Sequence, residues 1–391
     1  MLDPARLSGL VADVLPTVLE TRRVIHRNPE LSGEEYRTTE HIAGILRSQG
    51  LEPRVRTPKT GLLLDLGTDG PMIAFRADLD ALPIDEPRGL PFASDNPGVM
   101  HACGHDAHTA IGLGMALILS RLELPGRIRF IFQPAEETFP GGAYELVRER
   151  VLEGVRAIVA FHVDPGLETG RIGLKDGAIT SSADRFTITL EGPGGHTARP
   201  HATVDLVHAS GLVVSQLPAL VDRLVDARAP VALVFGTIRG GRAHNVIPTQ
   251  VEMQGTLRTA DRRLWEEVPA MFERLVHAVA APTGATATVH YQRGIPPVVN
   301  DPELIRSIGS SLVAAGGPEA VGPTYVSMGA EDFARYLEEI PGALLRLGCR
   351  VGEGMDLHSA SFRLDEDCLE VGTRLGTVAL LKLLGADGLS T

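Results

Sequence analysis

The sequence predicts an α/β fold in which a mixed, largely parallel sheet flanked by helices is interrupted by an inserted ferredoxin-like α+β domain. Short apolar strands alternate with helical segments between residues 61 and 163. Near residue 180 the order changes to strand, helix, strand, strand, helix, strand, and after Pro296-Pro297 the helix–strand alternation returns. Alternation of the first kind is typical of a parallel or mixed sheet with helices on both faces.

The first part of the chain begins with two helical segments. Residues 4–27 repeat apolar side chains at helical spacing, with a kink expected at Pro16, and Asn28-Pro29 ends the helix. The further elements expected before residue 180 are helices at Thr38–Leu46 and His105–Leu122 and strands at Leu62–Leu66, Met72–Phe75, Arg127–Phe132 and Ile158–Val163.

The inserted domain is recognised by a change in periodicity. Arg185–Leu190 alternates polar and apolar residues, as a half-exposed strand does. The next elements expected are a helix at Val204–Asp222, strands at Val231–Thr237 and Gln250–Arg258, a helix at Arg262–Ala280 and a strand at Thr286–Tyr291. This order is the ferredoxin-like pattern.

After the insert, helix–strand character returns in Pro302–Ala315, Glu331–Glu339 and Ala343–Leu347 and in a final helix, Asp367–Leu384. We therefore expect one α/β domain over residues 1–180 and 296–391, and an inserted domain over residues 181–295.

Composition excludes several classes of partner. The 391 residues carry a net charge of −12 with a pI of about 5.6, so binding to nucleic acid or to an anionic membrane is not expected. No apolar run is long enough to cross a bilayer, and the start Met-Leu-Asp-Pro-Ala-Arg lacks the pattern of a signal peptide, so we expect a cytoplasmic protein. Three cysteines are too few and too scattered for a disulfide framework.

The segment Met100–His108 gathers residue types that bind metals. Cys103 and His105 are two positions apart, and Gly104 between them permits a tight loop in which both reach one ion. A thiolate can also bridge two ions. The alternative interpretation is a buried cysteine beside a surface histidine.

Three more polar residues in this segment complicate the choice of ligand. His101 is a candidate neighbour of the ligands, Asp106 is a candidate partner that orients an imidazole, and His108 is a candidate solvent-facing side chain.

A doubled glutamate follows an expected strand directly. Adjacent carboxylates repel one another, so Glu136-Glu137 at a strand end costs free energy unless a cation neutralises it. One of the two carboxylates could bind metal while the other accepts a proton from the attacking water. His162 also ends an apolar run, and His358 lies in a loop context. Taken alone, each of these histidines is more typical of a structural or surface residue.

The insert carries its own polar motif, Gly194–His201. A donor such as His196 from a second domain could polarise a substrate carbonyl, although an exposed turn is the simpler interpretation. Asn245 and Arg258 offer amide and guanidinium donors suited to a carboxylate.

Together these motifs resemble the dinuclear-metal amidohydrolases of the aminoacylase, acetylornithine deacetylase and succinyl-diaminopimelate desuccinylase superfamily. The branch that fits best contains hippurate hydrolases, plant indole-acetyl-amino-acid hydrolases and bacterial N-acyl-amino-acid deacylases. The matching segments run almost from end to end: His26–Ser32, Arg76–Pro83, Met100–His108, Gln133–Glu137, Gly194–His201, His244–Pro248, Met328–Phe333 and Leu357–Ser359.

The resemblance implies a role for each matching residue. Cys103 would bridge two metal ions, His105 and His162 would complete one site, and Glu137 and His358 would complete the other. The resemblance further implies that Glu136 is the general base, that Asp80 supports the metal ligands and that His196 donates a hydrogen bond to the oxyanion. The substrate would be bound by Asn245, Arg258 and Gly329.

In the wider superfamily a histidine occupies the place of Asp78 and an aspartate the place of Cys103, so this chain follows the cysteine-containing branch. That departure leaves zinc, manganese, nickel or cobalt as the two divalent ions. The domain over residues 1–180 and 296–391 would bind the metals, and the insert would serve as a lid and dimerisation domain.

The expected activity is hydrolysis of the amide bond of an N-acyl amino acid, by a homodimer or higher homo-oligomer. A dipeptidase or metallo-carboxypeptidase of the same superfamily is the alternative within this class, because a peptide and an acyl amino acid differ little at the scissile bond. A cysteine hydrolase that uses Cys103 and a non-catalytic binding protein on the same fold are the alternatives of other classes.

Overall fold

The computed structural model describes residues 3–353 and 355–385, which form two compact units. The first unit comprises the described residues within 1–177, 300–325 and 335–391. The second comprises residues 178–299 and 326–334. The chain passes from one unit to the other at two short strands, β7 (Gly177–Ala178) and β14 (Val299–Asn300), and again on either side of residues 326–334.

The first unit is built on an eight-stranded sheet with the order β1-β2-β4-β3-β5-β16-β6-β15. Its four middle strands, β4, β3, β5 and β16, run parallel, whereas β1 with β2, β2 with β4, and β16 with β6 pair antiparallel. The strands are β1 (Arg54–Val55), β2 (Leu62–Leu66), β3 (Met72–Asp78), β4 (Arg127–Gln133), β5 (Val155–Asp164), β6 (Ile172–Leu174), β15 (Val321–Pro323) and β16 (Gly342–Gly348). The expected mixed, largely parallel sheet is confirmed.

Helices cover this sheet and bury its apolar residues. They are α1 (Pro4–Arg27), α2 (Tyr36–Ser48), α3 (His105–Leu119), α4 (Gly142–Arg148), α7 (Pro302–Gly316) and α8 (Asp367–Leu384), with short 3₁₀ helices η3 (Pro318–Ala320) and η4 (Asp332–Glu338). Pro16 lies inside α1, which continues through it.

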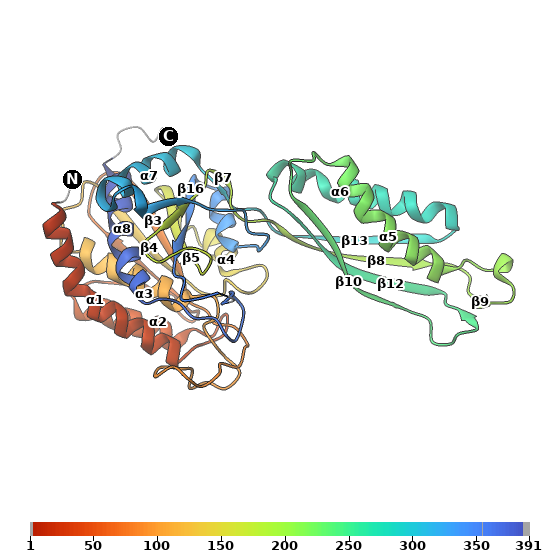
Figure 1. Ribbon diagram of the computed structural model, residues 1–391, viewed down its shortest axis with the longest axis horizontal. Helices are drawn as coiled ribbons and strands as arrows, with labels where there is room; N and C mark the ends of the chain where they lie inside the picture. Colours follow the sequence, from red (N-terminus) through yellow and green to blue (C-terminus); the bar gives the residue numbers. More distant parts are fainter. Residues whose placement is uncertain (1–2, 354, 386–391) are drawn as a thin grey trace. The chain divides into compact units, whose positions relative to one another are not determined.

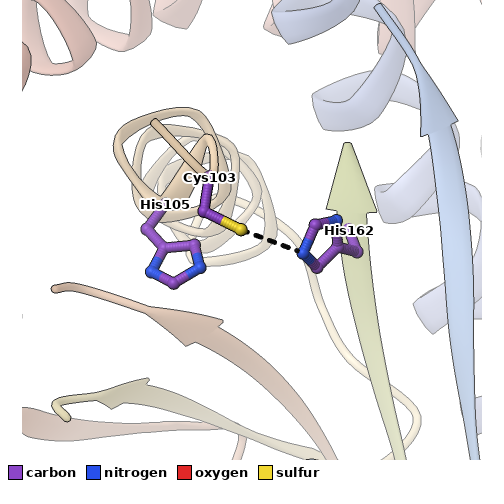
Figure 2. A group of neighbouring side chains, drawn as sticks. All are labelled: Cys103, His105 and His162. Carbon is purple, nitrogen blue, oxygen red and sulfur yellow. Dashed lines mark hydrogen bonds between the residues drawn. The ribbon is translucent and has the colours of Figure 1, made fainter. Parts of the chain in front are cut away.

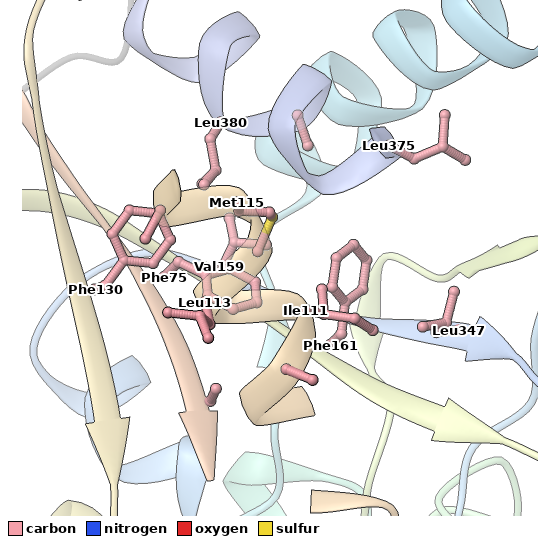
Figure 3. Close-up of a cluster of buried hydrophobic side chains, with 14 of the residues drawn as sticks. Phe75, Ile111, Leu113, Met115, Phe130, Val159, Phe161, Leu347, Leu375 and Leu380 are labelled. Carbon is pink, nitrogen blue, oxygen red and sulfur yellow. The ribbon is translucent and has the colours of Figure 1, made fainter. Parts of the chain in front are cut away.

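Helix α3 is buried along its whole length because it is apolar on nearly every side. It contacts strands β3, β4 and β5, and it also contacts α1 and α8 (Figure 1). Phe75, Phe161 and Met115 are among the side chains that fill the interior there (Figure 3). This packing sets the first turn of α3 at the carboxyl ends of the parallel strands, where polar side chains of successive strands gather.

The second unit has the expected ferredoxin-like order. Its four strands form an antiparallel sheet with the order β10-β12-β8-β13, and helices α5 and α6 pack on it. The main elements are β8 (Ala183–Glu191), α5 (Leu206–Leu224), β10 (Val231–Gly240), β12 (Gln250–Thr259), α6 (Arg262–Ala280) and β13 (Thr286–Ile295). The short elements are β9 (Gly195–His196), β11 (Val246–Ile247), η1 (Pro200–Ala202) and η2 (Ala281–Thr283).

One segment groups differently from the domain boundaries expected from the sequence. Residues 326–334 belong to the second unit, although residues 296–391 were assigned to the α/β domain. The reason is local pairing: the Ser327 amide donates to the Ile179 carbonyl at 2.9 Å, and the Ser181 hydroxyl donates to the Met328 carbonyl at 2.7 Å. None of the helices within the described ranges is both long enough and apolar enough to cross a membrane.

Candidate metal centre

The five expected metal ligands converge in the first unit. The Sγ atom of Cys103 lies 3.5 Å from Nε2 of His162 and 3.3 Å from Nε2 of His358 (Figure 2 shows the side of the cluster formed by Cys103, His105 and His162). The potential ligand atoms of Cys103, His105 and His162 lie within 4.8 Å of one another, as do those of Cys103, Glu137 and His358. Cys103 is therefore common to both groups.

The loop before α3 is shaped by Gly104. Its φ of +81° lies in the left-handed region that L-residues rarely adopt, and a Cβ at this position would overlap Cγ2 of Val163. The turn at Gly104 places Cys103 in the loop and His105 at the first position of α3. His358 also has a positive φ, 59°, and its amide donates to the Ala102 carbonyl at 2.8 Å. A non-glycine residue held in this region is a strained position of the kind found at functional sites.

Hydrogen bonds to the far side of each imidazole orient two of the rings. Nδ1 of His162 donates to the Val163 carbonyl at 2.8 Å, so its Nε2 is left with a lone pair on the Cys103 side. Nδ1 of His105 lies 2.9 Å from the Asp80 carbonyl and 3.2 Å from Oδ1 of Asp80. Nε2 of His105 is buried without a hydrogen-bond partner in residues 3–353 and 355–385. A buried imidazole nitrogen left open in this way fits a metal ligand.

Asp80 links two of the candidate ligands. Besides orienting His105, its Oδ2 accepts from the Ser32 hydroxyl at 2.6 Å and from the Glu137 amide at 2.9 Å. The pKa of Asp80 is lowered, because hydrogen bonding to His105 and Ser32 outweighs the burial that would raise it. Asp80 therefore carries a negative charge that supports the imidazole and the backbone at Glu137.

The electrostatics of the donor group favour a cation. Hydrogen bonds with Cys103 and Glu137 raise the pKa of His358 to about 10. Burial opposes the charged form of His105, but Asp78 and Cys103 outweigh it and raise the pKa of that imidazole. The anionic donors thus draw protons onto the imidazoles, and divalent cations would supply the same positive charge.

Burial, together with the Glu137 carboxylate, raises the pKa of the Cys103 thiol. Cys103 belongs to two groups of potential metal ligands, a setting more typical of a metal-binding thiolate than of the nucleophile of a cysteine hydrolase.

A second buried group lies behind the first, around Asp78. Nδ1 of His108 donates to Oδ1 of Asp78 at 2.7 Å, and Nη1 of Arg76 donates to Oδ2 at 2.6 Å. The Val163 amide donates to Nε2 of His108 at 2.8 Å, so both ring nitrogens of His108 are used by the protein. The interpretation of His108 as a solvent-facing side chain is wrong, because α3 is buried along its whole length.

Asp106 does orient an imidazole, but that of His26. Its Oδ2 accepts from Nδ1 of His26 at 2.8 Å and from Nε of Arg22 at 3.0 Å. The neighbouring His101 is also buried, and neither of its ring nitrogens has a hydrogen-bond partner within the described chain. Burial lowers its pKa to about 4, which keeps the ring neutral.

Glu136, the expected general base, lies next to the candidate metal ligands. It is buried, and one of its carboxylate oxygens lies within 4.8 Å of ligand atoms of both His105 and Glu137. The preceding Ala135 has a φ of 57°, and its amide donates to Oε1 of Glu35 at 2.8 Å. This turn at the end of β4 directs the doubled glutamate to the cluster.

The remaining expected site residues lie in the second unit, in two separate places. His196 and Asn245 are neighbours, because β9 pairs with β11 and the Thr197 amide donates to the Asn245 carbonyl at 3.2 Å. Arg258 and Gly329 are neighbours elsewhere, since Nη1 of Arg258 donates to the Met328 carbonyl at 3.0 Å.

Asn245 and Arg258 do not meet in one chain. Asn245 precedes the start of β12 at Gln250, whereas Arg258 lies near its end, and eight residues of strand span about 27 Å. The expectation that both residues hold one substrate carboxylate therefore requires correction for a single chain.

Comparison with known proteins identifies the family. Peptidase family M20/M25/M40 matches residues 74–382, so the chain belongs to this family. The superfamily expected from the sequence is confirmed, and so is the expectation of a hydrolase that acts on amide bonds.

Individual relatives are similar over most of their length. The chain is 40% identical over 362 residues to a Bacillus subtilis N-acetylcysteine deacetylase, which covers 91% of this chain and 94% of that protein. It is 42% identical over 333 residues to an N-acyl-L-amino acid amidohydrolase of Geobacillus stearothermophilus, and this alignment covers 84% of this chain and 90% of that protein. A solved Bacillus subtilis structure described as a dinuclear metal binding peptidase from the M20 family aligns with a TM-score of 0.84 at 36% identity. This alignment covers 95% of this chain and 99% of the solved chain.

One relative is much longer than this chain. A Rhodococcus jostii protein that carries the name glutamate–cysteine ligase 2-3 is 44% identical over 374 residues. The match covers 95% of this chain but 47% of that protein, so the chain spans about half of its length.

Proposed function

We propose that this protein is a metal-dependent amidohydrolase that cleaves N-acyl amino acids into a carboxylate and a free amino acid. The observation that carries the proposal is the convergence of Cys103, His105, Glu137, His162 and His358 beside the buried carboxylate of Glu136. The names of the Bacillus subtilis and Geobacillus relatives support this substrate class.

The donor set fits two divalent cations. Cys103, His105 and His162 would hold one ion, and Cys103, Glu137 and His358 would hold the other, with the thiolate shared. Sulfur and nitrogen donors favour zinc, nickel or cobalt, and the carboxylate keeps manganese within the set. Two such cations would supply Lewis acidity toward the scissile carbonyl and the attacking water.

Glu136 is proposed to move the proton in both halves of the reaction. As the water oxygen bonds to the carbonyl carbon, the Glu136 carboxylate accepts its proton, and as the carbon–nitrogen bond breaks, it returns that proton to the amine. Asp80 keeps His105 in the tautomer that leaves Nε2 open, through the contacts at Nδ1. The base and the ligands are thus held by elements of the same unit.

His196 is proposed to donate a hydrogen bond to the developing oxyanion. Its Nδ1 accepts from the Ala198 amide at 3.0 Å, so the neutral ring carries its proton on Nε2 and can donate it. The carboxylate of the substrate would be bound by Asn245, Arg258 and Gly329.

The separation of Asn245 from Arg258 supports a homodimer. A site that uses both residues would take Arg258 and Gly329 from one chain and His196 and Asn245 from the other. We propose this arrangement for the homodimer expected from the sequence. Its cytoplasmic location stays a prediction.

Metal reconstitution followed by a substrate panel tests the proposal. We expect zinc, manganese, nickel or cobalt to restore turnover of an N-acetyl, N-benzoyl or long-chain N-acyl amino acid to chelated protein. Exclusive turnover of dipeptides would favour the peptidase alternative, and failure of every ion with every amide would refute the proposed function.

The variant Glu136→Gln tests whether Glu136 is the general base and whether the protein is a catalyst rather than a binding protein. It should keep its metal content and lose about 10²- to 10⁴-fold in turnover. Turnover close to that of the wild type would contradict the assigned role.

A further inference from the structure

Arg346 is a buried arginine for which the described structure shows no side-chain partner. It lies near the end of β16 and is 7% exposed. No hydrogen bond or ion pair within 4.0 Å joins its side chain to any residue in the described parts of the chain. The other arginines buried to this degree, Arg22, Arg76 and Arg129, are all paired: with Asp106 at 3.0 Å, Asp78 at 2.6 Å and Asp65 at 2.7 Å, respectively.

An unpaired buried charge lowers stability, so its presence requires a reason. Removing a charged group from water without a partner costs free energy, and buried charges in proteins are therefore paired or bind a ligand. The acid two residues beyond His162 does not offset it: Asp164 accepts from the Gly166 amide at 2.8 Å and forms no ion pair with Arg346 among the described residues. The guanidinium is left available for an anion that the protein itself does not supply.

The position of Arg346 links it to the candidate metal centre. In the parallel pairing of β16 with β5, Arg346 is the register partner of His162, so both side chains leave the sheet on the same face. A group bound by Arg346 would therefore lie beside the reacting bond.

A second polar side chain near Arg346 also has no partner. Strand β16 lies between β5 and β6, and in its pairing with β6 Arg346 is the register partner of Gly173. A Cβ on that glycine would lie 3.1 Å from Cβ of Arg346 and 2.9 Å from Cβ of Thr324. Oγ1 of Thr324 is buried without a hydrogen-bond partner in the described chain. Glycine at position 173 lets the side chains of Leu167, Thr324 and Arg346 lie close together above its Cα.

The chemistry of this pair identifies its ligand. A guanidinium presents a planar fork of N–H donors that matches a carboxylate, and a neighbouring hydroxyl adds a further donor.

We propose that Arg346 and Thr324 form a carboxylate-binding subsite that selects amide substrates with a second carboxylate, in addition to the α-carboxylate of the amino acid. The second carboxylate could belong to a dicarboxylic acyl group or to an acidic amino-acid side chain. This inference rests on the proposed function, since it names the substrate class of the same site.

Two pairs of substrates that differ only in charge test the subsite. N-acetyl-L-glutamate is compared with N-acetyl-L-glutamine, and N-succinyl-L-alanine with its neutral succinamoyl amide. The wild-type enzyme should prefer the charged member of at least one pair, and that pair identifies which part of the substrate reaches Arg346.

Arg346→Met should lower kcat/KM for the preferred charged substrate about 10- to 100-fold, mainly through KM, the loss expected for a hydrogen bond to a charged group. Its neutral counterpart should change less than about threefold, and Arg346→Lys should keep part of the preference. Because an unpaired buried cation is removed, Arg346→Met should not lower Tm.

Arg156→Met is the matched control. Nε and Nη2 of Arg156 are also buried without a hydrogen-bond partner in the described chain, but Arg156 lies six residues and about 20 Å along β5 from His162. The substitution should therefore leave the charge preference unchanged. Calorimetric binding of succinate to the metal-loaded protein provides a readout independent of turnover, and Arg346→Met should weaken it at least tenfold.

The outcomes separate the two proposals. A wild-type enzyme that hydrolyses no N-acyl amino acid refutes the proposed function. If it hydrolyses them but Arg346→Met changes both members of each pair equally, or neither member, the subsite is refuted alone. Succinate binding that survives unchanged in Arg346→Met also refutes the subsite.

Discussion

Replacing Gly104 by alanine probes how the loop before α3 holds the candidate ligands. Alanine at a φ of +81° costs about 1–2 kcal/mol, because an L-residue is strained in the left-handed region. The new Cβ would also overlap Cγ2 of Val163, and overpacking in a full interior costs about 1–3 kcal/mol. We therefore expect Gly104→Ala to lose about 2–5 kcal/mol of the free energy of unfolding.

Relief of the overlap would shift the backbone between Cys103 and His105. Metal binding should weaken together with stability, because both residues belong to the group of donors around the shared thiol. Urea denaturation of the metal-free protein measures the first effect, and metal content after dialysis against a weak chelator measures the second.

Gly154→Ala is the matched control for this variant. Gly154 has a φ of +77°, but nothing lies within 4 Å of the Cβ that it would gain, so this substitution carries the backbone strain alone. It should cost about 1–2 kcal/mol and leave metal content unchanged.

The double variant Gly104→Ala with Val163→Ala separates the steric contribution. Val163→Ala removes both γ-methyl groups, including the one that the new Cβ overlaps, and should give a favourable coupling energy of about 1–3 kcal/mol. The reasoning is refuted if Gly104→Ala costs no more than Gly154→Ala and retains its metal.

Two further predictions concern assembly and pH. If His196 acts across a homodimer, mixing inactive Glu136→Gln with inactive His196→Ala should restore about a quarter of wild-type turnover. Random pairing makes half of the dimers mixed, and each mixed dimer has one complete site out of two. No recovery after verified subunit exchange would show that His196 acts within its own chain. Hydrogen bonds from Arg56 and then Lys59 lower the pKa of Glu149 to about 2, so its contribution to stability is present above its ordinary pKa of 4.5 and is lost as pH falls toward 2. The difference in Tm between wild type and Glu149→Gln should therefore shrink between pH 5 and pH 2.5, and a constant difference would contradict this pairing.

Elements with strong periodicity could be predicted to the residue. The bounds expected for β2, α6 and α8 agree with the structure, because a short apolar strand and amphipathic or apolar helices are recognised from neighbouring residues alone. Helix α4 and the short strands β6 and β15 were not expected. Each is seven residues or fewer, and the strands are held by pairing with distant partners rather than by their own pattern.

The partners of individual side chains could not be predicted in this way. His108 looked like a surface residue beside a metal motif, yet it is buried against Asp78 and the Val163 amide. Arg346 had no signal in the sequence at all. Its significance depends on the pairing of β16 with β5 and on the absence of a counter-ion in the described chain.

The sequence by itself determined the order of strands and helices and the chemical identity of the candidate ligands, since residue type and local periodicity are properties of short segments. Only the tertiary structure decided that residues 103, 137, 162 and 358 meet and that Asp80 leaves Nε2 of His105 open. These are relations between segments far apart in the chain, and packing of the sheet and helices sets the distances between them.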